Sequence, residues 1–138
     1  MKLYYRQLGQ GKPLVILHGL FGFSDNWQTQ AKKFAEYFEV TLVDLRNHGH
    51  SGWSDEFSYA LMVQDLHELF QDLQIQKPIL LGHSMGGKLA MHFDRTYPNS
   101  IDSINSNFQF TKYFELDLQL TKDKRLVCLH DPIITDKY

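Results

Sequence analysis

Residues 79–87 read Ile-Leu-Leu-Gly-His-Ser-Met-Gly-Gly, an apolar run that ends in the pattern Gly-x-Ser-x-Gly. The run fits a short strand buried on both faces, and the residues after it repeat apolar side chains at helical spacing until Pro98. A serine on a sharp strand-to-helix turn is held in a strained conformation with its hydroxyl exposed. We therefore predict a nucleophile elbow with Ser84 as the nucleophile, in which Gly82 and Gly86 avoid steric collisions.

The elbow predicts a binding site for a negatively charged oxygen. The backbone N–H of Met85, at the start of the following helix, would point toward an oxyanion formed on a substrate. A second donor is expected from the loop at residues 18–22, His-Gly-Leu-Phe-Gly, which follows a buried-strand pattern at 13–17. Its glycines let the backbone approach a ligand closely, so we predict that the Leu20 N–H lies beside that of Met85.

Three motifs together carry a resemblance to a known family. Besides the loop at 18–22, a third buried run at 40–44 leads into Asp-Leu-Arg-Asn-His-Gly-x-Ser at 44–51, and the elbow reads Gly-His-Ser-Met-Gly-Gly-Lys at 82–88. The chain resembles the α/β-hydrolases, specifically the small soluble carboxylesterase and acyl-thioesterase branch, over about residues 1–104. The resemblance implies that His18 satisfies neighbouring backbone groups and is not the catalytic base.

Helix-like segments alternate with the strand-like ones, which predicts an α/β fold with a mostly parallel sheet flanked by helices. Each segment has one apolar face, with acidic and amide residues opposite. The apolar positions are Trp27, Ala31, Phe34, Ala35 and Phe38 in the first segment and Met62, Leu66, Leu69, Phe70 and Leu73 in the second. The segment at 3–8 is predicted to form an antiparallel hairpin with the strand at 13–17, at the sheet edge.

The resemblance fades after Pro98. It implies a catalytic acid about two dozen residues beyond the serine, but that position holds Phe108, and the cap, last strand and last helix of the family have no counterpart. We therefore predict one domain, 1–138, with a family-like core at 1–104. Beyond this core the family pattern is truncated or rebuilt, and no cap domain is expected. In the divergent segment, 105–138, strict alternation over 114–121, a turn at 121–124 and an apolar run at 125–129 predict a β-hairpin.

The base of a catalytic triad has two candidates, because the resemblance implies the chain order serine, acid, histidine. His92 lies on the helix after the elbow and is not expected to reach back to the hydroxyl. His130 is the remaining candidate, at the end of an apolar run; the competing interpretation is an ordinary solvent-facing residue. No aspartate after Ser84 has a position that assigns it as the acid.

Composition restricts the partners. The net charge is −2 with no Lys/Arg cluster, which argues against nucleic acid or an anionic membrane as partner. No apolar run has membrane-spanning length, and Met1-Lys2 opens onto a strand, so we expect a cytoplasmic protein. The single cysteine, Cys128, excludes an internal disulfide. Neither a metal-ligand cluster nor a cofactor motif is evident, and an exposed sheet edge would allow a homodimer.

Two functions follow as hypotheses. The first is a serine hydrolase of short acyl esters or thioesters, in which Ser84 attacks the carbonyl carbon, the Leu20 and Met85 N–H groups hold the oxyanion, and His130 shuttles the proton. The second is a shortened hydrolase core with no competent triad, serving as a scaffold, binding module or folding unit. A serine at position 84 argues against dehalogenases and epoxide hydrolases, which use aspartate there. Four aromatic residues would either line an apolar entrance or simply pack: Phe21, Phe23, Trp27 and Trp53.

Overall fold

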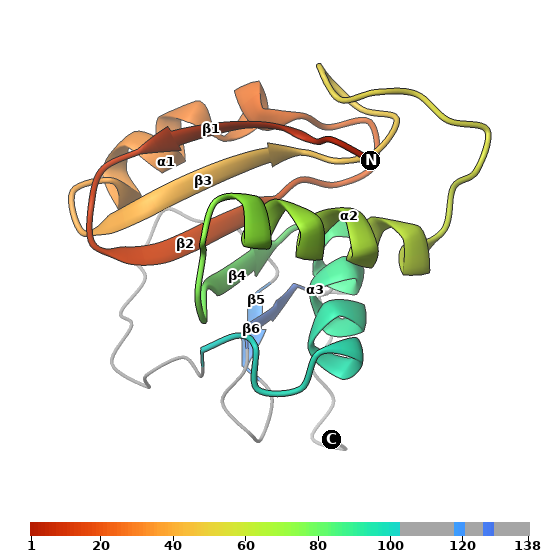
Figure 1. Ribbon diagram of the computed structural model, residues 1–138. Coiled ribbons are helices and arrows are strands. Elements are labelled where there is room, and N and C mark those ends of the chain that lie inside the picture. The colour runs from red at the N-terminus through yellow and green to blue at the C-terminus, as the bar shows by residue number, and fades with distance from the viewer. Residues whose placement is uncertain (103–117, 121–125, 129–138) are drawn as a thin grey trace.

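Strands and amphipathic helices alternate in the computed structural model, which describes residues 1–102, 118–120 and 126–128 (Figure 1). Helices lie on both faces of a four-stranded sheet. The elements are β1 (Tyr4–Leu8), β2 (Lys12–Leu17), a 3-10 turn (Ser24–Trp27), α1 (Gln28–Phe34), β3 (Phe38–Asp44), α2 (Tyr59–Asp72), β4 (Ile79–Gly82), α3 (Met85–Thr96), β5 (Leu118–Leu120) and β6 (Leu126–Cys128). None of the helices in these described stretches is long and apolar enough to cross a membrane.

The sheet has the strand order β1-β3-β2-β4. Strand β2 runs parallel to β3 on one side and to β4 on the other, so that Leu17 is opposite both Val43 and Gly82. The carboxyl ends of these three strands therefore meet at one edge of the sheet, and the loops that follow them gather there. This confirms the predicted α/β architecture with a mostly parallel sheet.

Strand β1 is antiparallel and at the sheet edge, as expected, but the predicted hairpin with β2 is wrong. It pairs with β3 along its whole length, from Tyr4 opposite Asp44 to Leu8 opposite Val40. The physical reason is competition for strand edges: β3 and β4 occupy both edges of β2, so β1 cannot pair with β2 and pairs with the outer edge of β3 instead.

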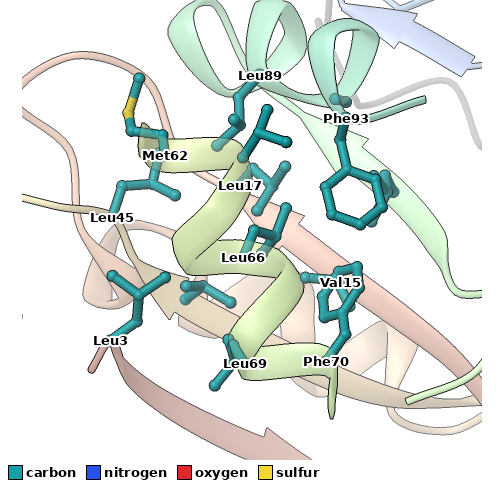
Figure 2. Packing of buried hydrophobic residues seen from close by; sticks show 14 of the residues in the cluster. Leu3, Val15, Leu17, Leu45, Met62, Leu66, Leu69, Phe70, Leu89 and Phe93 are labelled. Atoms are coloured by element: carbon teal, nitrogen blue, oxygen red, sulfur yellow. The ribbon is translucent and has the colours of Figure 1, made fainter. Parts of the chain in front are cut away.

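Alternate residues of β2 supply the cores of the two layers, as the period of two requires. Val15 and Leu17 face α2 and α3, whereas Leu14 and Ile16 face α1 on the other side. Figure 2 shows the larger cluster, in which side chains of α2 and α3 close over the sheet. Its labelled members are Leu3, Val15, Leu17, Leu45, Met62, Leu66, Leu69, Phe70, Leu89 and Phe93. Complete burial of such a side chain stabilises the fold by about 1.5–3 kcal/mol.

Two details of the helix predictions need correction. The first predicted helix is shorter than its pattern, since Phe38 begins β3 and does not belong to the helical face. On α2 the apolar face is confirmed, but Asp65 lies on it and is only 1% exposed, although acidic residues were expected on the opposite face. A buried carboxylate must have partners, and these are described below.

The predicted C-terminal hairpin is confirmed for the part that the structure describes. Strands β5 and β6 are antiparallel, with Leu118 opposite Cys128 and Leu120 opposite Leu126. The rest of the predicted hairpin, residues 114–117, 121–125 and 129, lies outside the described residues.

The end of α2 carries a residue with an unfavourable backbone conformation. Gln74 has φ 54° where the Ile75 N–H donates to the Phe70 carbonyl at 2.9 Å, the pattern of a Schellman motif. Glycine is preferred there because a Cβ disfavours the left-handed region. We expect Gln74→Gly to raise the free energy of unfolding by about 0.5–1 kcal/mol. Urea denaturation would test this beside Gln64→Gly, an exposed position within α2, which should instead lose about 1 kcal/mol; destabilisation by both changes would contradict the prediction.

Candidate active site

Ser84 occupies the turn between β4 and α3, where the strand ends at Gly82 and the helix begins at Met85. Its backbone has φ 50° and ψ −112°, a combination that residues with a side chain rarely adopt. Two hydrogen bonds of His83 hold the turn: its N–H donates to the Leu17 carbonyl at 2.9 Å, and its carbonyl accepts from the Gly86 N–H at 2.8 Å. The serine is half-exposed, so the fold holds it in a strained conformation that keeps its side chain accessible.

The two elbow glycines are needed for close backbone packing. A Cβ on Gly82 would lie 2.5 Å from backbone atoms of Gly86 and Gly87. A Cβ on Gly86 would lie 2.2 Å from the Leu17 carbonyl oxygen. Both positions therefore require glycine, as the sequence predicted, but the atoms that exclude a side chain are backbone atoms of β2 and α3.

The loop after β2 lies directly beside the serine. A Cβ on Gly19 would be 3.3 Å from the Ser84 Cβ and 2.6 Å from His83 Nδ1. The loop is a tight turn, in which the Gly22 N–H donates to the Gly19 carbonyl at 2.9 Å and Phe21 has φ 60°. The sequence predicted that this loop lies beside the elbow through Leu20, but not that Gly19 is the residue packed against His83 and Ser84.

The peptide group between Gly19 and Leu20 is fixed by hydrogen bonds to its oxygen. The Gly19 carbonyl accepts from the Gly22 N–H at 2.9 Å and lies 2.8 Å from His18 Nδ1. Because a trans peptide is planar, with its C=O and N–H on opposite sides, fixing the oxygen also fixes the direction of the Leu20 N–H. The Met85 N–H belongs to the first residue of α3, where helical geometry provides no acceptor within the helix. The two predicted oxyanion donors thus belong to the residue that follows Ser84 and to the turn that packs against it.

His18 acts on the backbone at both ring nitrogens. The Leu45 N–H donates to Nε2 at 2.9 Å, so Nε2 is unprotonated and Nδ1 carries the proton that it donates to the Gly19 carbonyl. The ring is 1% exposed, and burial lowers its pKa, with a smaller contribution from the nearby His48. This arrangement agrees with the expected structural role of His18.

The neutral state of His18 predicts a pH-dependent stability. Below the ordinary histidine pKa of 6.5 the unfolded chain binds a proton at His18 that the folded chain, with its lowered pKa, does not bind. The free energy of unfolding should therefore fall as the pH drops from about 6.5 toward the folded pKa, by at most about 1.4 kcal/mol per pH unit for one proton. Urea denaturation at several pH values between 8 and 5 would measure this. The slope should be shallower in His18→Gln, and equal slopes in both proteins would contradict the assignment.

Asp44, the first residue of the motif at 44–51, binds the segment that follows the loop at 18–22. Its fully buried carboxylate accepts from the Ser24 N–H at 2.6 Å and from the His50 N–H at 2.8 Å. Burial opposes ionisation of this group, but the hydrogen bonds from His50 and Ser24 prevail, and the pKa of Asp44 is lowered. Asp44 therefore links the segment at Ser24 to the loop at His50, both at the carboxyl edge of the sheet. The sequence did not predict this structural role.

The other predicted candidates are placed as follows. His92 is exposed and stacks on Tyr59 at 4.8 Å, as expected for a residue that does not serve Ser84. His130 and Phe108 lie outside the described residues, and so do the aspartates after position 102. Within the described part of the chain, no histidine side chain hydrogen-bonds to Ser84, and no cluster of His, Cys, Asp or Glu could hold a metal ion.

The aromatic residues expected near the entrance separate into two kinds. Trp27 is buried and its ring meets that of His83 edge-on at 6.3 Å, so it packs behind the elbow. Phe21 and Trp53 are 88% and 80% exposed, whereas Phe23 is half-buried. Of the four, Phe21 is on the loop beside Ser84 and is available to a ligand.

Most of this chain is similar to known proteins. A family model described as the alpha/beta hydrolase fold matches residues 12–119. The sn-1-specific diacylglycerol lipase ABHD11 of Danio rerio is 42% identical over 98 residues, which are 70% of this chain and 31% of that protein. Esterase YbfF of Escherichia coli (strain K12) is 38% identical over 92 residues, 67% of this chain and 36% of that one.

A solved structure agrees with these sequence relatives. A marine microorganism esterase superposes with a TM-score of 0.72 at 44% identity, covering 74% of this chain and 40% of that chain. The chain spans about a third of the length of the curated relatives it matches.

Proposed function

Because this chain belongs to the α/β-hydrolase fold family, with esterases and lipases among its relatives, we propose that it is a serine esterase acting on small acyl esters or thioesters. Ser84 is the nucleophile, and the backbone N–H groups of Leu20 and Met85 form the oxyanion hole. His130 is the proposed general base.

The proposed reaction has two steps. The Ser84 Oγ attacks the carbonyl carbon and gives its proton to His130, while the negative charge that forms on the carbonyl oxygen is held by the two N–H groups. The C–O or C–S bond then breaks, the leaving alcohol or thiol takes the proton, and an acyl-enzyme remains. Water attacks the acyl-enzyme by the same route and releases the carboxylic acid, which restores the serine.

One observation carries this proposal: a strained, accessible serine lies against a loop whose peptide is fixed in direction. Each oxyanion-hole donor typically contributes about 10²–10³ in rate. When a member of a catalytic triad is removed, the oxyanion hole and substrate binding still accelerate the reaction roughly 10³–10⁴-fold over the uncatalysed rate. The geometry around Ser84 thus supports measurable acyl transfer even with a weak base.

The loop beside the serine also supports an apolar acyl group. Leu20 and Phe21 are 55% and 88% exposed on the same turn that fixes the Leu20 N–H. Apolar side chains next to the oxyanion donors would contact the acyl chain of a bound ester and gain from its removal from water.

Covalent labelling with an alkyl fluorophosphonate tests this function without requiring turnover. The Ser84 oxygen would displace fluoride from phosphorus, and peptide mapping by mass spectrometry should find one adduct, on the peptide that contains Ser84. A short-chain p-nitrophenyl ester should slow the labelling by competition, and His130→Ala should slow it if His130 is the base. The absence of an adduct on the folded chain, or an adduct on Ser51 or Ser54, would overturn the proposal and favour a scaffold without turnover.

A further inference from the structure

A buried ion pair lies behind the second motif, outside the groups that the proposed reaction uses. Arg46 Nε donates to Asp65 Oδ2 at 2.7 Å and Arg46 Nη2 donates to Asp65 Oδ1 at 2.9 Å. The side chains are 7% and 1% exposed. Two parallel charge-assisted hydrogen bonds fix the plane of the guanidinium group against α2.

The same arginine closes the loop between β3 and α2. Its Nη1 donates to the Glu56 carbonyl at 2.9 Å, which ties the far end of the loop to its beginning. Inside this closure, Asn47 Nδ2 donates to the Ser54 carbonyl and Asn47 Oδ1 accepts from the Ser54 N–H, both at 2.8 Å. The ion pair with Asp65 therefore holds an already cross-linked loop at a defined position on α2.

Two residues at the start of this loop, Leu45 and His48, contact His18, and Arg46 orients the second of them. The Arg46 carbonyl accepts from His48 Nδ1 at 2.8 Å, which orients the His48 ring. That ring packs against the His18 ring at 5.1 Å between centroids, and the Leu45 N–H donates to His18 Nε2 at 2.9 Å. His18 in turn holds the Gly19 carbonyl, the other end of the peptide that presents the Leu20 N–H. An unbroken series of contacts thus joins the buried ion pair to the proposed oxyanion hole.

We infer that Arg46, held by Asp65, is a positioning residue of the oxyanion hole and acts through His48 and His18 on the direction of the Leu20 N–H. The inference rests on the proposed function, because it assigns a purpose to that N–H. Arg46 touches no reacting atom, so its effect must appear in how well the transition state is held and not in whether the substrate binds.

Two variants test the series of contacts at different points. His48→Phe keeps an aromatic ring against His18 but removes the Nδ1–H that orients it. The double change Arg46→Met with Asp65→Leu removes both charges of the ion pair, so that neither side chain is left buried as a lone charge. Asp65 also accepts from the N-terminal ammonium group of Met1, which in this variant keeps Glu68 as its partner. For hydrolysis of a p-nitrophenyl ester we expect kcat to fall about 10- to 100-fold in both, with KM within about twofold. Arg6→Met, which removes a guanidinium from the more exposed pair with Asp25, is the matched control and should leave kcat unchanged.

A magnetic-resonance measurement separates positioning from simple stabilisation. In both test variants the Leu20 amide signal and the ring nitrogens of His18 should shift, the latter toward a mixture of tautomers. If a folded variant is less stable and yet keeps its kcat and its Leu20 and His18 signals unchanged, that result would overturn the inference and leave the ion pair a structural role only. If the wild-type chain is not labelled at Ser84, the proposed function fails, whereas the Leu20 and His18 signals still decide whether the ion pair positions this peptide.

Discussion

Ser84→Ala is expected to lower kcat/KM for ester hydrolysis by about 10³-fold or more, because it removes the hydroxyl that is proposed to accept the acyl group in the first step. Met85 and Leu20 keep their positions, so substrate binding should change little and the loss should appear in kcat. Steady-state kinetics on a short-chain p-nitrophenyl ester would measure it, with the uncatalysed rate subtracted. Hydrolysis that survives this change would show that the chemistry takes place at another residue.

A second substitution at the same position separates chemistry from strain. Ser84→Gly also lacks the hydroxyl, but glycine adopts φ 50° without a steric penalty. We expect its free energy of unfolding to exceed that of Ser84→Ala by about 1 kcal/mol. Urea denaturation of the two inactive variants would measure this difference. Equal stabilities would mean that the elbow does not hold the serine under strain.

Gly86→Ala is expected to produce the largest loss of stability. The added Cβ would lie 2.2 Å from the Leu17 carbonyl oxygen and 2.7 Å from that of His18. These are backbone atoms at the end of β2, a central strand paired on both sides, so they cannot move aside without disrupting the sheet. We expect a loss of about 3 kcal/mol, a large fraction of the stability of a typical domain.

Gly52→Ala is the matched control for this change. Its Cβ would meet only the end of the flexible Met1 side chain, at 3.6 Å, and its backbone is not left-handed. Urea denaturation should show a change within about 0.5 kcal/mol for Gly52→Ala. A Gly86→Ala protein as stable as this control would contradict the packing described between α3 and β2. The Gly86 variant should also lose Ser84 labelling, because any shift of α3 moves the elbow.

The local parts of the site were predictable from the sequence. The Gly-x-Ser-x-Gly pattern marks the elbow around Ser84 directly. The conflict that requires glycine at 82 is with Gly86 and Gly87, close in the chain, whereas the one at Gly86 is with the distant Leu17. The start of α3 at Met85 follows from the same turn. The expectation that His18 serves the backbone came from a family resemblance, and the structure shows which backbone groups it serves.

The signal for the buried ion pair was present in the sequence but was not used. Asp65 lies among apolar residues on the inward face of α2, next to Leu66. A charged residue at such a position implies a buried partner, but no local rule says that the partner is Arg46, 19 residues earlier in the chain.

The sequence by itself determined the order of the strands and helices, their apolar faces apart from Asp65 and the end of the first helix, and where the strained serine lies. These depend on backbone sterics and on the spacing of apolar residues along a few turns of chain. Only the tertiary structure decided that β1 pairs with β3 and not with β2, that Gly19 touches the elbow, and that Asp65 holds Arg46. The reason is physical: a strand's apolar pattern states which face is buried but not which edge is free, and edges are assigned by competition among all the strands at once. Contacts such as Gly19 with Ser84 exist only after that competition has placed β2 beside β4.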